Sequence, residues 1–235
     1  MQIESVFDTF CAELEKREGI ITEDNIRYYC FASMLNEDDQ LNHYTLEYPY
    51  SEQCGDLQNE ELDMLYQSDD ETWCFEMKFH RNGESESTYA HTDAAGSLFN
   101  DLLRLQALKQ NAKWKNARYF FLYVTDSEMY NYLTAGKECK GGLNKEYRAK
   151  LKEFIELDAG QELSIDFRNI EDVPKTFIGS ALTSFVKDAS LEHKDKIQIR
   201  RILLNRKQDN IQSQSPSLKE DNESKFCYAR LYEIL

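Results

Sequence analysis

Residues 61–79 read ELDMLYQSDDETWCFEMKF, and this stretch decides the fold. Two runs rich in β-forming residues, 61–67 and 72–79, flank a polar Ser-Asp-Asp-Glu segment that is typical of a turn. The pattern predicts two antiparallel strands joined as a hairpin. The rest of the fold is built outward from this hairpin.

The second strand of the hairpin carries charges among aromatic residues. Alternation places Glu76 and Lys78 on one face, with Phe75 on the other. Charged groups inside such a strand are expensive to bury without a partner or a function. Asp63 on the paired strand can approach both. Two neighbouring carboxylates repel unless a cation relieves them, and such oxygen ligands suit Mg²⁺ or Mn²⁺. An ordinary cross-strand ion pair on a solvated sheet face is the alternative.

Periodicity and capping signals predict the elements around the hairpin. Thr22 is an N-cap candidate, and an apolar run reading ARYFFLYVT is typical of a strand buried on both faces. The elements predicted for this part of the chain are helices over 3–17, 22–35 and 93–111, a strand over 43–50, the hairpin, and a strand over 117–125.

The carboxyl-terminal part of the chain predicts a mixture of helices and strands. Residues 208–224 have little to bury and predict a mobile loop. The other predicted elements are a short helix after a cap at Asp126 or Ser127, helices over 145–157 and 177–186, and strands over 162–168, 196–206 and 226–234, the last at a sheet edge.

This order of elements predicts an α/β fold with three layers, in which helices cover both faces of a central mixed sheet. Residues 1–140 form the expected core. Residues 141–235 form an α+β extension that we expect to pack on the same domain.

Composition narrows the class of protein. The chain has 235 residues, 41% of them hydrophobic, which excludes collagenous and wholly disordered proteins. No apolar run reaches the length of a membrane span, and the acidic amino terminus is unlike a secretory signal, so we expect a cytoplasmic protein that does not enter membranes. Six dispersed cysteines indicate reduced thiols, and no nucleotide-binding glycine motif or serine-hydrolase elbow occurs.

The charge of the chain is unevenly distributed. Its net value of −15 argues against a nucleic-acid partner, because phosphate binding is largely electrostatic. Residues 1–90, however, hold 22 acidic and 5 basic residues, whereas 91–235 hold 21 and 23. The acidic part can gather metal, imitate nucleic acid or serve solubility, and the remainder is close to neutral.

The helix with an early acid, the strands bearing Asp63 and Glu76-Met77-Lys78, the long helix and the buried strand together resemble the PD-(D/E)XK nuclease superfamily, which has the restriction-endonuclease-like fold. The resemblance covers about residues 20–135. It implies an αβββαβ core and metal-dependent hydrolysis of phosphodiester bonds, with Asp63 and Glu76 as ligands of Mg²⁺ or Mn²⁺ and Lys78 assisting the nucleophile. Leu62 stands where the motif has its name-giving proline.

A third metal-supporting acid is implied by the same resemblance, and two residues compete for it. Glu23 lies at the start of the first core helix, and Glu47 lies in the first strand. Both alternatives stay open.

Several basic side chains are candidates for contact with nucleic acid. As alternatives, Arg104 forms a surface salt bridge with Asp101, and the basic carboxyl-terminal strand is an ordinary amphipathic strand. The candidates are His80, Arg81, Arg104, Arg200 and Arg201.

The sequence therefore favours a metal-dependent nuclease acting on nucleic acid, with DNA preferred, in prokaryotic defence or repair. A homodimer or a partner protein is a further expectation. The alternative is a catalytically inactive, nuclease-like binding or regulatory protein that acts through its acidic amino-terminal half.

Overall fold

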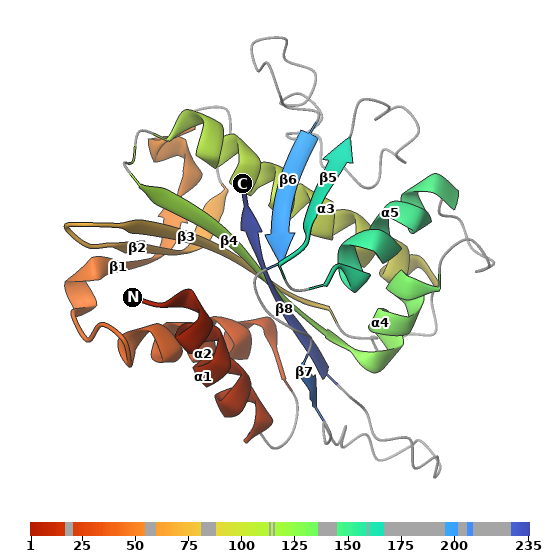
Figure 1. The fold of residues 1–235 in the computed structure, drawn as a ribbon, viewed down its shortest axis with the longest axis horizontal. Coiled ribbons are helices and arrows are strands. Elements are labelled where there is room, and N and C mark those ends of the chain that lie inside the picture. Colours follow the sequence, from red (N-terminus) through yellow and green to blue (C-terminus); the bar gives the residue numbers. More distant parts are fainter. Residues whose placement is uncertain are drawn as a thin grey trace.

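The fold comes from a computed structural model that describes residues 1–16, 21–54, 60–80, 88–112, 114, 116–135, 145–158, 160–166, 196–201, 206–208 and 227–235. At its centre lies an eight-stranded mixed sheet in the order β1-β2-β3-β4-β8-β6-β5, with β7 paired to β8 (Figure 1). The strands are β1 (Tyr44–Pro49), β2 (Glu61–Gln67), β3 (Thr72–His80), β4 (Ala117–Asp126), β5 (Glu162–Asp166), β6 (Lys196–Arg201), β7 (Arg206–Gln208) and β8 (Cys227–Ile234).

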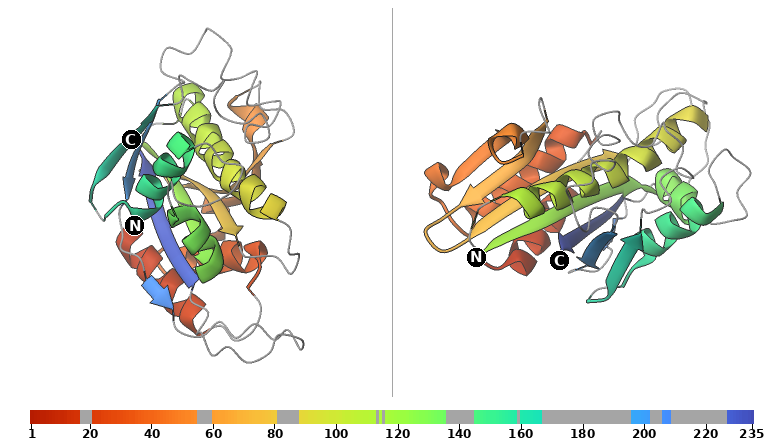
Figure 2. Two further views of the ribbon diagram at one scale, coloured as in Figure 1. Left: turned by 90° about the vertical axis from the view of Figure 1, so that its right-hand side faces the viewer. Right: turned by 90° about the horizontal axis from the view of Figure 1, so that it is seen from above.

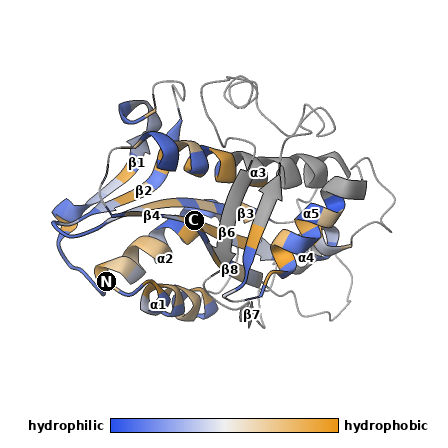
Figure 3. Ribbon diagram, turned by 45° about the horizontal axis from the view of Figure 1, so that its top comes forward, coloured by the Kyte–Doolittle hydropathy of each residue, from blue (hydrophilic) through white to orange (hydrophobic). Residues whose placement is uncertain are grey.

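Helices lie on both faces of the sheet (Figure 2). One face packs against the first two helices, and the opposite face packs against the other three. The amphipathic pattern of α1, α4 and α5 is visible as alternating hydrophobic and hydrophilic residues (Figure 3). The helices are α1 (Ile3–Glu15), α2 (Glu23–Leu35), α3 (Thr88–Asn111), α4 (Ser127–Thr134) and α5 (Lys145–Glu156), with 3₁₀ turns η1 (Leu41–His43) and η2 (Tyr50–Glu52).

The hairpin of β2 and β3 forms in antiparallel register, with Met64 opposite Phe75. β3 and β4 are parallel, so the chain crosses over the sheet through α3 between them. Alternation along β3 and β4 divides the core: Phe75 and Phe120 stack at 5.0 Å on the α1–α2 side, whereas Phe121 lies on the α3 side. The prediction that β4 is buried on both faces is confirmed.

Thr22 begins α2 with a capping box. Its side chain accepts a hydrogen bond from the Asn25 backbone N–H at 3.3 Å, and the Asn25 side chain accepts one from the Thr22 N–H at 3.1 Å. We expect Thr22→Ala to lower the free energy of unfolding by about 1 kcal/mol, because the Asn25 backbone N–H loses its acceptor. Urea denaturation measures this loss. Thr22→Ser keeps the hydroxyl and is the control, and equal stability of both variants contradicts the assignment.

Of the strand predicted over 196–206, residues 196–201 form β6 and Arg206 begins β7, whereas residues 202–205 lie outside the described residues. The prediction that the final strand lies at a sheet edge is wrong. β8 lies inside the sheet between β4 and β6, and its charged residues are buried or paired: Arg230 is fully buried and Glu233 contacts Arg118 at 2.7 Å. A strand that alternates aromatic and charged residues has the sequence pattern of a solvent-exposed edge strand, but it can also lie inside a sheet when its charges pair with neighbouring elements.

Some predicted elements lie at or beyond the limits of the described residues. α3 begins at Thr88, five residues before the predicted start at Asp93. The predicted helix at 177–186 and the loop at 208–224, apart from Gln208, fall outside the described residues. Strands from both halves of the chain share one sheet. Among the described helices, none combines the length and apolar character needed to cross a membrane.

Candidate functional site

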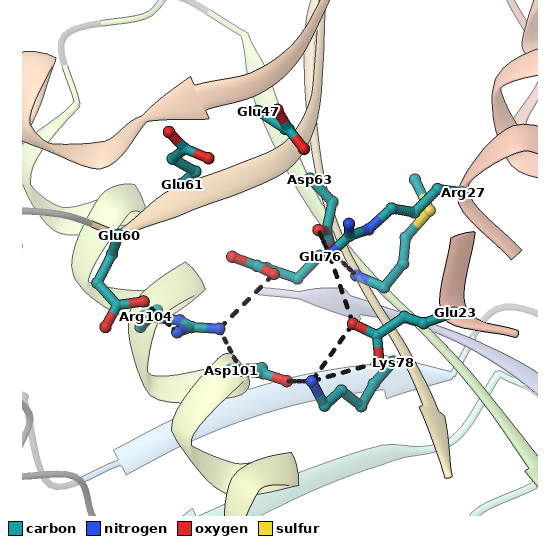
Figure 4. A pocket seen from close by; sticks show the side chains of 11 residues that line it. Glu23, Arg27, Glu47, Glu60, Glu61, Asp63, Glu76, Lys78, Asp101 and Arg104 are labelled. Carbon is teal, nitrogen blue, oxygen red and sulfur yellow. Dashed lines mark hydrogen bonds and ion pairs between the residues drawn. The ribbon is translucent and has the colours of Figure 1, made fainter. Parts of the chain in front are cut away.

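The candidate site lies where β2 and β3 separate. Their ladder ends at the pair Met64 and Phe75, beyond which β2 stays paired with β1 and β3 stays paired with β4. Asp63 bridges the gap, because its Oδ2 accepts a hydrogen bond from the Met77 N–H at 2.6 Å. A pocket of about 260 Å³ opens at this split (Figure 4). The separation of two strands thus creates a polar cavity inside the sheet.

Charged side chains line almost the whole pocket. Seven carboxylates and three cations face it, so the lining carries four negative charges in excess when every group is ionised. A concave site with this imbalance attracts cations. Its lining residues are Glu23, Arg27, Glu47, Glu60, Glu61, Asp63, Glu76, Met77, Lys78, Asp101 and Arg104.

Asp63 and Glu76 form the floor and are both buried. Burial raises the pKa of Asp63, although Arg27 counteracts it. Burial also raises the pKa of Glu76 well above its ordinary value, Arg104 opposes the rise, and Asp63 adds to it. Each carboxylate has one oxygen held by an uncharged donor: the Met77 N–H for Asp63, and the Tyr50 hydroxyl at 2.6 Å for Glu76.

Two arginines face the remaining oxygens of these carboxylates. Arg27, from α2, places Nη2 at 2.7 Å from Asp63 Oδ1. Arg104, from α3, places Nη2 at 3.9 Å from Glu76 Oε2, while its guanidinium also contacts Asp101 and lies 2.5 Å from Glu60. The buried acids are therefore neutralised from both helix layers (Figure 4).

Lys78 lies on the same face of β3 as Glu76 and lines the pocket. Its Nζ is 3.4 Å from Glu23 Oε2 and 3.9 Å from Asp101 Oδ2. The ammonium is partly exposed, with 24% of the side chain accessible. It is thus held between the start of α2 and the middle of α3, within reach of anything that enters the pocket.

The structure brings Asp63, Glu76 and Lys78 into one pocket, together with both competing acids. Glu23 contacts Lys78, whereas Glu47 lines the pocket from β1 opposite Asp63. Glu47 has a φ of 54°, a left-handed conformation that is uncommon for glutamate. Such strain often marks functional sites.

The predicted nucleic-acid contacts have different outcomes. Arg104 lines the pocket, but the Asp101–Arg104 contact is not a surface salt bridge, because Asp101 is buried. His80 is also buried and lies 3.1 Å from the Tyr123 hydroxyl, outside the pocket lining. Burial and the charge of Lys78 lower the pKa of His80 to about 3.

The remaining basic candidates cannot be placed against the pocket. Arg81 lies outside the described residues, and Arg200 and Arg201 belong to β6 without described side chains.

Sequence reasoning missed the lining residues Arg27, Glu60 and Glu61. It also missed Tyr50, which is not part of the lining but donates a hydrogen bond to Glu76. Arg27 follows Glu23 by four residues, a spacing that places both on one face of α2, so helical periodicity could have found it. Tyr50 and Glu60 flank a loop, and their backbones meet where the Tyr50 N–H donates to the Glu60 carbonyl at 2.9 Å. No sequence pattern shows that this closure delivers the Tyr50 hydroxyl to Glu76.

The donor set at the pocket floor fits a hard divalent cation in its chemistry, since carboxylate oxygens of Asp63 and Glu76 are the ligands that Mg²⁺ and Mn²⁺ prefer. In the part of the chain that the structure describes, no three acidic, histidine or cysteine side chains form a group ready to hold a metal ion. The side chains of Arg27, Lys78 and Arg104 lie among the carboxylates. Cation binding would therefore require rearrangement of these side chains.

Comparison of the chain with protein-family models, with curated proteins and with solved structures finds no match.

Proposed function

We propose that the chain is a divalent-metal-dependent nuclease that hydrolyses phosphodiester bonds, with DNA as its favoured substrate. The observation that carries the proposal is the convergence of Asp63, Glu76 and Lys78 in a polar pocket where two strands separate. The succession α2, β1, β2, β3, α3, β4 also agrees with the αβββαβ core that the resemblance implies.

In the proposed site, Asp63 and Glu76 would hold Mg²⁺ or Mn²⁺. A metal bound there would lower the pKa of the attacking water and stabilise negative charge at the reacting phosphate. Lys78 orients the attacking water and stabilises negative charge as it develops, because its partly exposed ammonium is a donor that lines the pocket. Tyr50 fixes the orientation of the Glu76 carboxylate through the 2.6 Å hydrogen bond.

Labelled single- and double-stranded DNA and RNA, incubated with the chain in Mg²⁺, Mn²⁺ or EDTA, test the proposal. We expect cleavage of DNA in either metal and none in EDTA. A folded chain that leaves every substrate intact in both metals contradicts the nuclease.

A second candidate is a catalytically inactive binding protein. It is favoured by the internal ion pairs, since the buried carboxylates Asp63, Glu76 and Asp101 each face a cation of the same chain. This candidate predicts no cleavage in the assay above, and no dependence of stability on Mn²⁺.

Tyr50→Phe is expected to raise the Mg²⁺ concentration needed for half-maximal cleavage about tenfold, because the Glu76 carboxylate loses the donor that orients it. The maximal rate at saturating Mg²⁺ should change little. A titration of cleavage rate against Mg²⁺ measures both quantities. Tyr48→Phe removes a hydroxyl from β1 that lies outside the pocket lining and serves as the control. An equal shift in both variants contradicts the role of Tyr50.

A further inference from the structure

The arginines beside Asp63 and Glu76 differ in which carboxylate they contact most closely. Arg104 makes its short contacts with Glu60 and Asp101, and its distance to Glu76 is 3.9 Å. Arg27 is the reverse: its short contact, 2.7 Å, is to Asp63, and its distances to Glu23 and Asp24 are 3.4 Å and 3.6 Å. Asp63 is thus the main anchor of Arg27.

Asp63 has both oxygens engaged. Oδ2 accepts from the Met77 N–H at 2.6 Å, and Oδ1 contacts Arg27 at 2.7 Å. The contact with the Met77 N–H lies where β2 and β3 separate, and the pairing of these strands within the sheet fixes its position. A cation that binds Asp63 through Oδ1 therefore competes with the guanidinium for this oxygen.

We propose that Arg27 is an exchangeable counter-ion, which leaves Asp63 when a divalent cation binds and then contacts a phosphate of the nucleic acid. This inference rests on the proposed function and adds to it a substrate-binding residue and a coupling between metal and substrate.

Three features of Arg27 allow the exchange. Its side chain is 32% exposed, so it can turn outward without movement of α2. Its Nε has no hydrogen-bond partner among the residues that the structure describes, so that atom does not hold the present position. Finally, a guanidinium matches phosphate geometry with two parallel hydrogen bonds. Figure 4 shows the side chain reaching from α2 over Asp63 at the side of the pocket.

The charge of the pocket explains why the two events are coupled. When every lining carboxylate is ionised, the lining has four negative charges in excess and repels a phosphodiester before any cation enters. A divalent cation halves that excess, and the departure of Arg27 from the floor places a positive group nearer to the substrate. Metal therefore favours substrate binding, and by reciprocity substrate favours metal binding.

The affinity for Mn²⁺, measured by electron paramagnetic resonance at pH 8, tests the first half of the exchange. We expect Arg27→Gln to bind Mn²⁺ about tenfold more tightly than the parent, because the internal competitor is gone. Arg27→Lys keeps a cation and should remain near the parent. Lys16→Gln removes the same charge from an exposed pair on α1 and is the control. An Arg27→Gln affinity equal to or weaker than that of the parent overturns the exchange.

Binding of a labelled 20-base-pair DNA duplex tests the second half. In Ca²⁺ we expect Arg27→Gln to bind the duplex about tenfold more weakly than the parent, because one phosphate contact is lost. In EDTA the loss should be clearly smaller, since Arg27 is then engaged with Asp63 and only its charge contributes. An equal loss in Ca²⁺ and EDTA, or no loss in either, overturns the substrate contact.

The outcomes separate this inference from the proposed function. Absence of Mn²⁺ binding to the parent removes the metal site and the exchange together, whereas tight binding with an unaffected Arg27→Gln variant removes the exchange alone. If Arg27→Gln does not fold, crystals of the parent with Mn²⁺ decide the question. Mn²⁺ on Asp63 with Arg27 displaced supports the exchange, and Mn²⁺ bound there with the Arg27 contact intact overturns it.

Discussion

Lys78→Ala is expected to lower the rate of Mg²⁺-dependent DNA cleavage by about a thousandfold, a typical loss when a positioned donor is removed from a reacting group. The Lys78 ammonium faces the pocket between Glu23 and Asp101. β3 contains no other lysine or arginine that could replace it. The effect should appear in the maximal rate, and additional Mg²⁺ should not restore it. Single-turnover cleavage at saturating DNA measures the rate.

A companion variant distinguishes the role of the lysine from that of the carboxylates. Asp63→Asn should also abolish cleavage at ordinary Mg²⁺ concentrations, but excess Mn²⁺ should restore part of it, because the defect lies in metal affinity. Lys152→Ala removes an exposed lysine on α5 that pairs with Glu156 and is the control. Circular dichroism and thermal melting establish that each variant is folded. Activity of Lys78→Ala within threefold of the parent contradicts its assigned role.

Local signals were sufficient to predict the hairpin and the start of α2. The bounds of β2, Glu61–Gln67, agree with the prediction because polar residues end the β-forming run at both sides. Thr22 caps α2 as expected, since a threonine before two acids is a strong start signal. The placement of Asp63, Glu76 and Lys78 in one pocket follows from the same alternation and antiparallel pairing.

Contacts between distant elements could not be predicted in this way. Arg27 reaches Asp63 only because α2 packs over β2 and β3, and Tyr50 reaches Glu76 only because the loop before β2 closes. The interior position of β8 was missed for a related reason. Its charges look solvated in the sequence, and the Arg118–Glu233 pair exists only once β4 and β8 are neighbours.

The pocket accounts for part of the acidic charge of residues 1–90. Six of its seven lining carboxylates lie within residues 1–90, and Asp101 is the seventh. Two of the five basic residues in that half, Arg27 and Lys78, line the same pocket. Part of the charge imbalance is therefore concentrated at one concave site, and the total of −15 does not show how the charge is distributed over the surface.

Arg104→Met is expected to lower the free energy of unfolding by about 3 kcal/mol at pH 8, because it leaves the buried Glu76 without its cation and Asp101 with the more distant Lys78 alone. The guanidinium contacts Asp101 and lies 3.9 Å from Glu76, and both carboxyl groups are buried. Burial by itself would lower the pKa of Arg104, but these acids raise it above its ordinary value, so the side chain is charged throughout. Methionine fills a similar space without charge.

The loss should depend on pH. Burial raises the pKa of Asp101 to about 6, despite the opposing effects of Arg104 and Lys78, and it raises that of Glu76 as well. Groups whose pKa is higher in the folded than in the unfolded chain favour folding when protonated. Their contribution is complete below the unfolded pKa and is lost as pH rises through the folded pKa. Removing Arg104 raises both folded values further, so the variant is destabilised most at pH 8 and by only about 1 kcal/mol at pH 5.

Urea denaturation at pH 5, 6 and 8 measures this dependence, and Arg118→Met provides the matched control. Arg118 also pairs with a carboxylate, Glu233, at 2.7 Å, but that pair lies outside the pocket. Its loss should be nearly constant between pH 5 and 8, because the Arg118–Glu233 pair does not contact the buried carboxylates of the pocket. A loss for Arg104→Met that is equally constant would show that the pocket carboxylates do not take up protons as the pH falls. Arg104 would then stabilise the fold through packing of its aliphatic stem, and not as the counter-ion of Asp101 and Glu76.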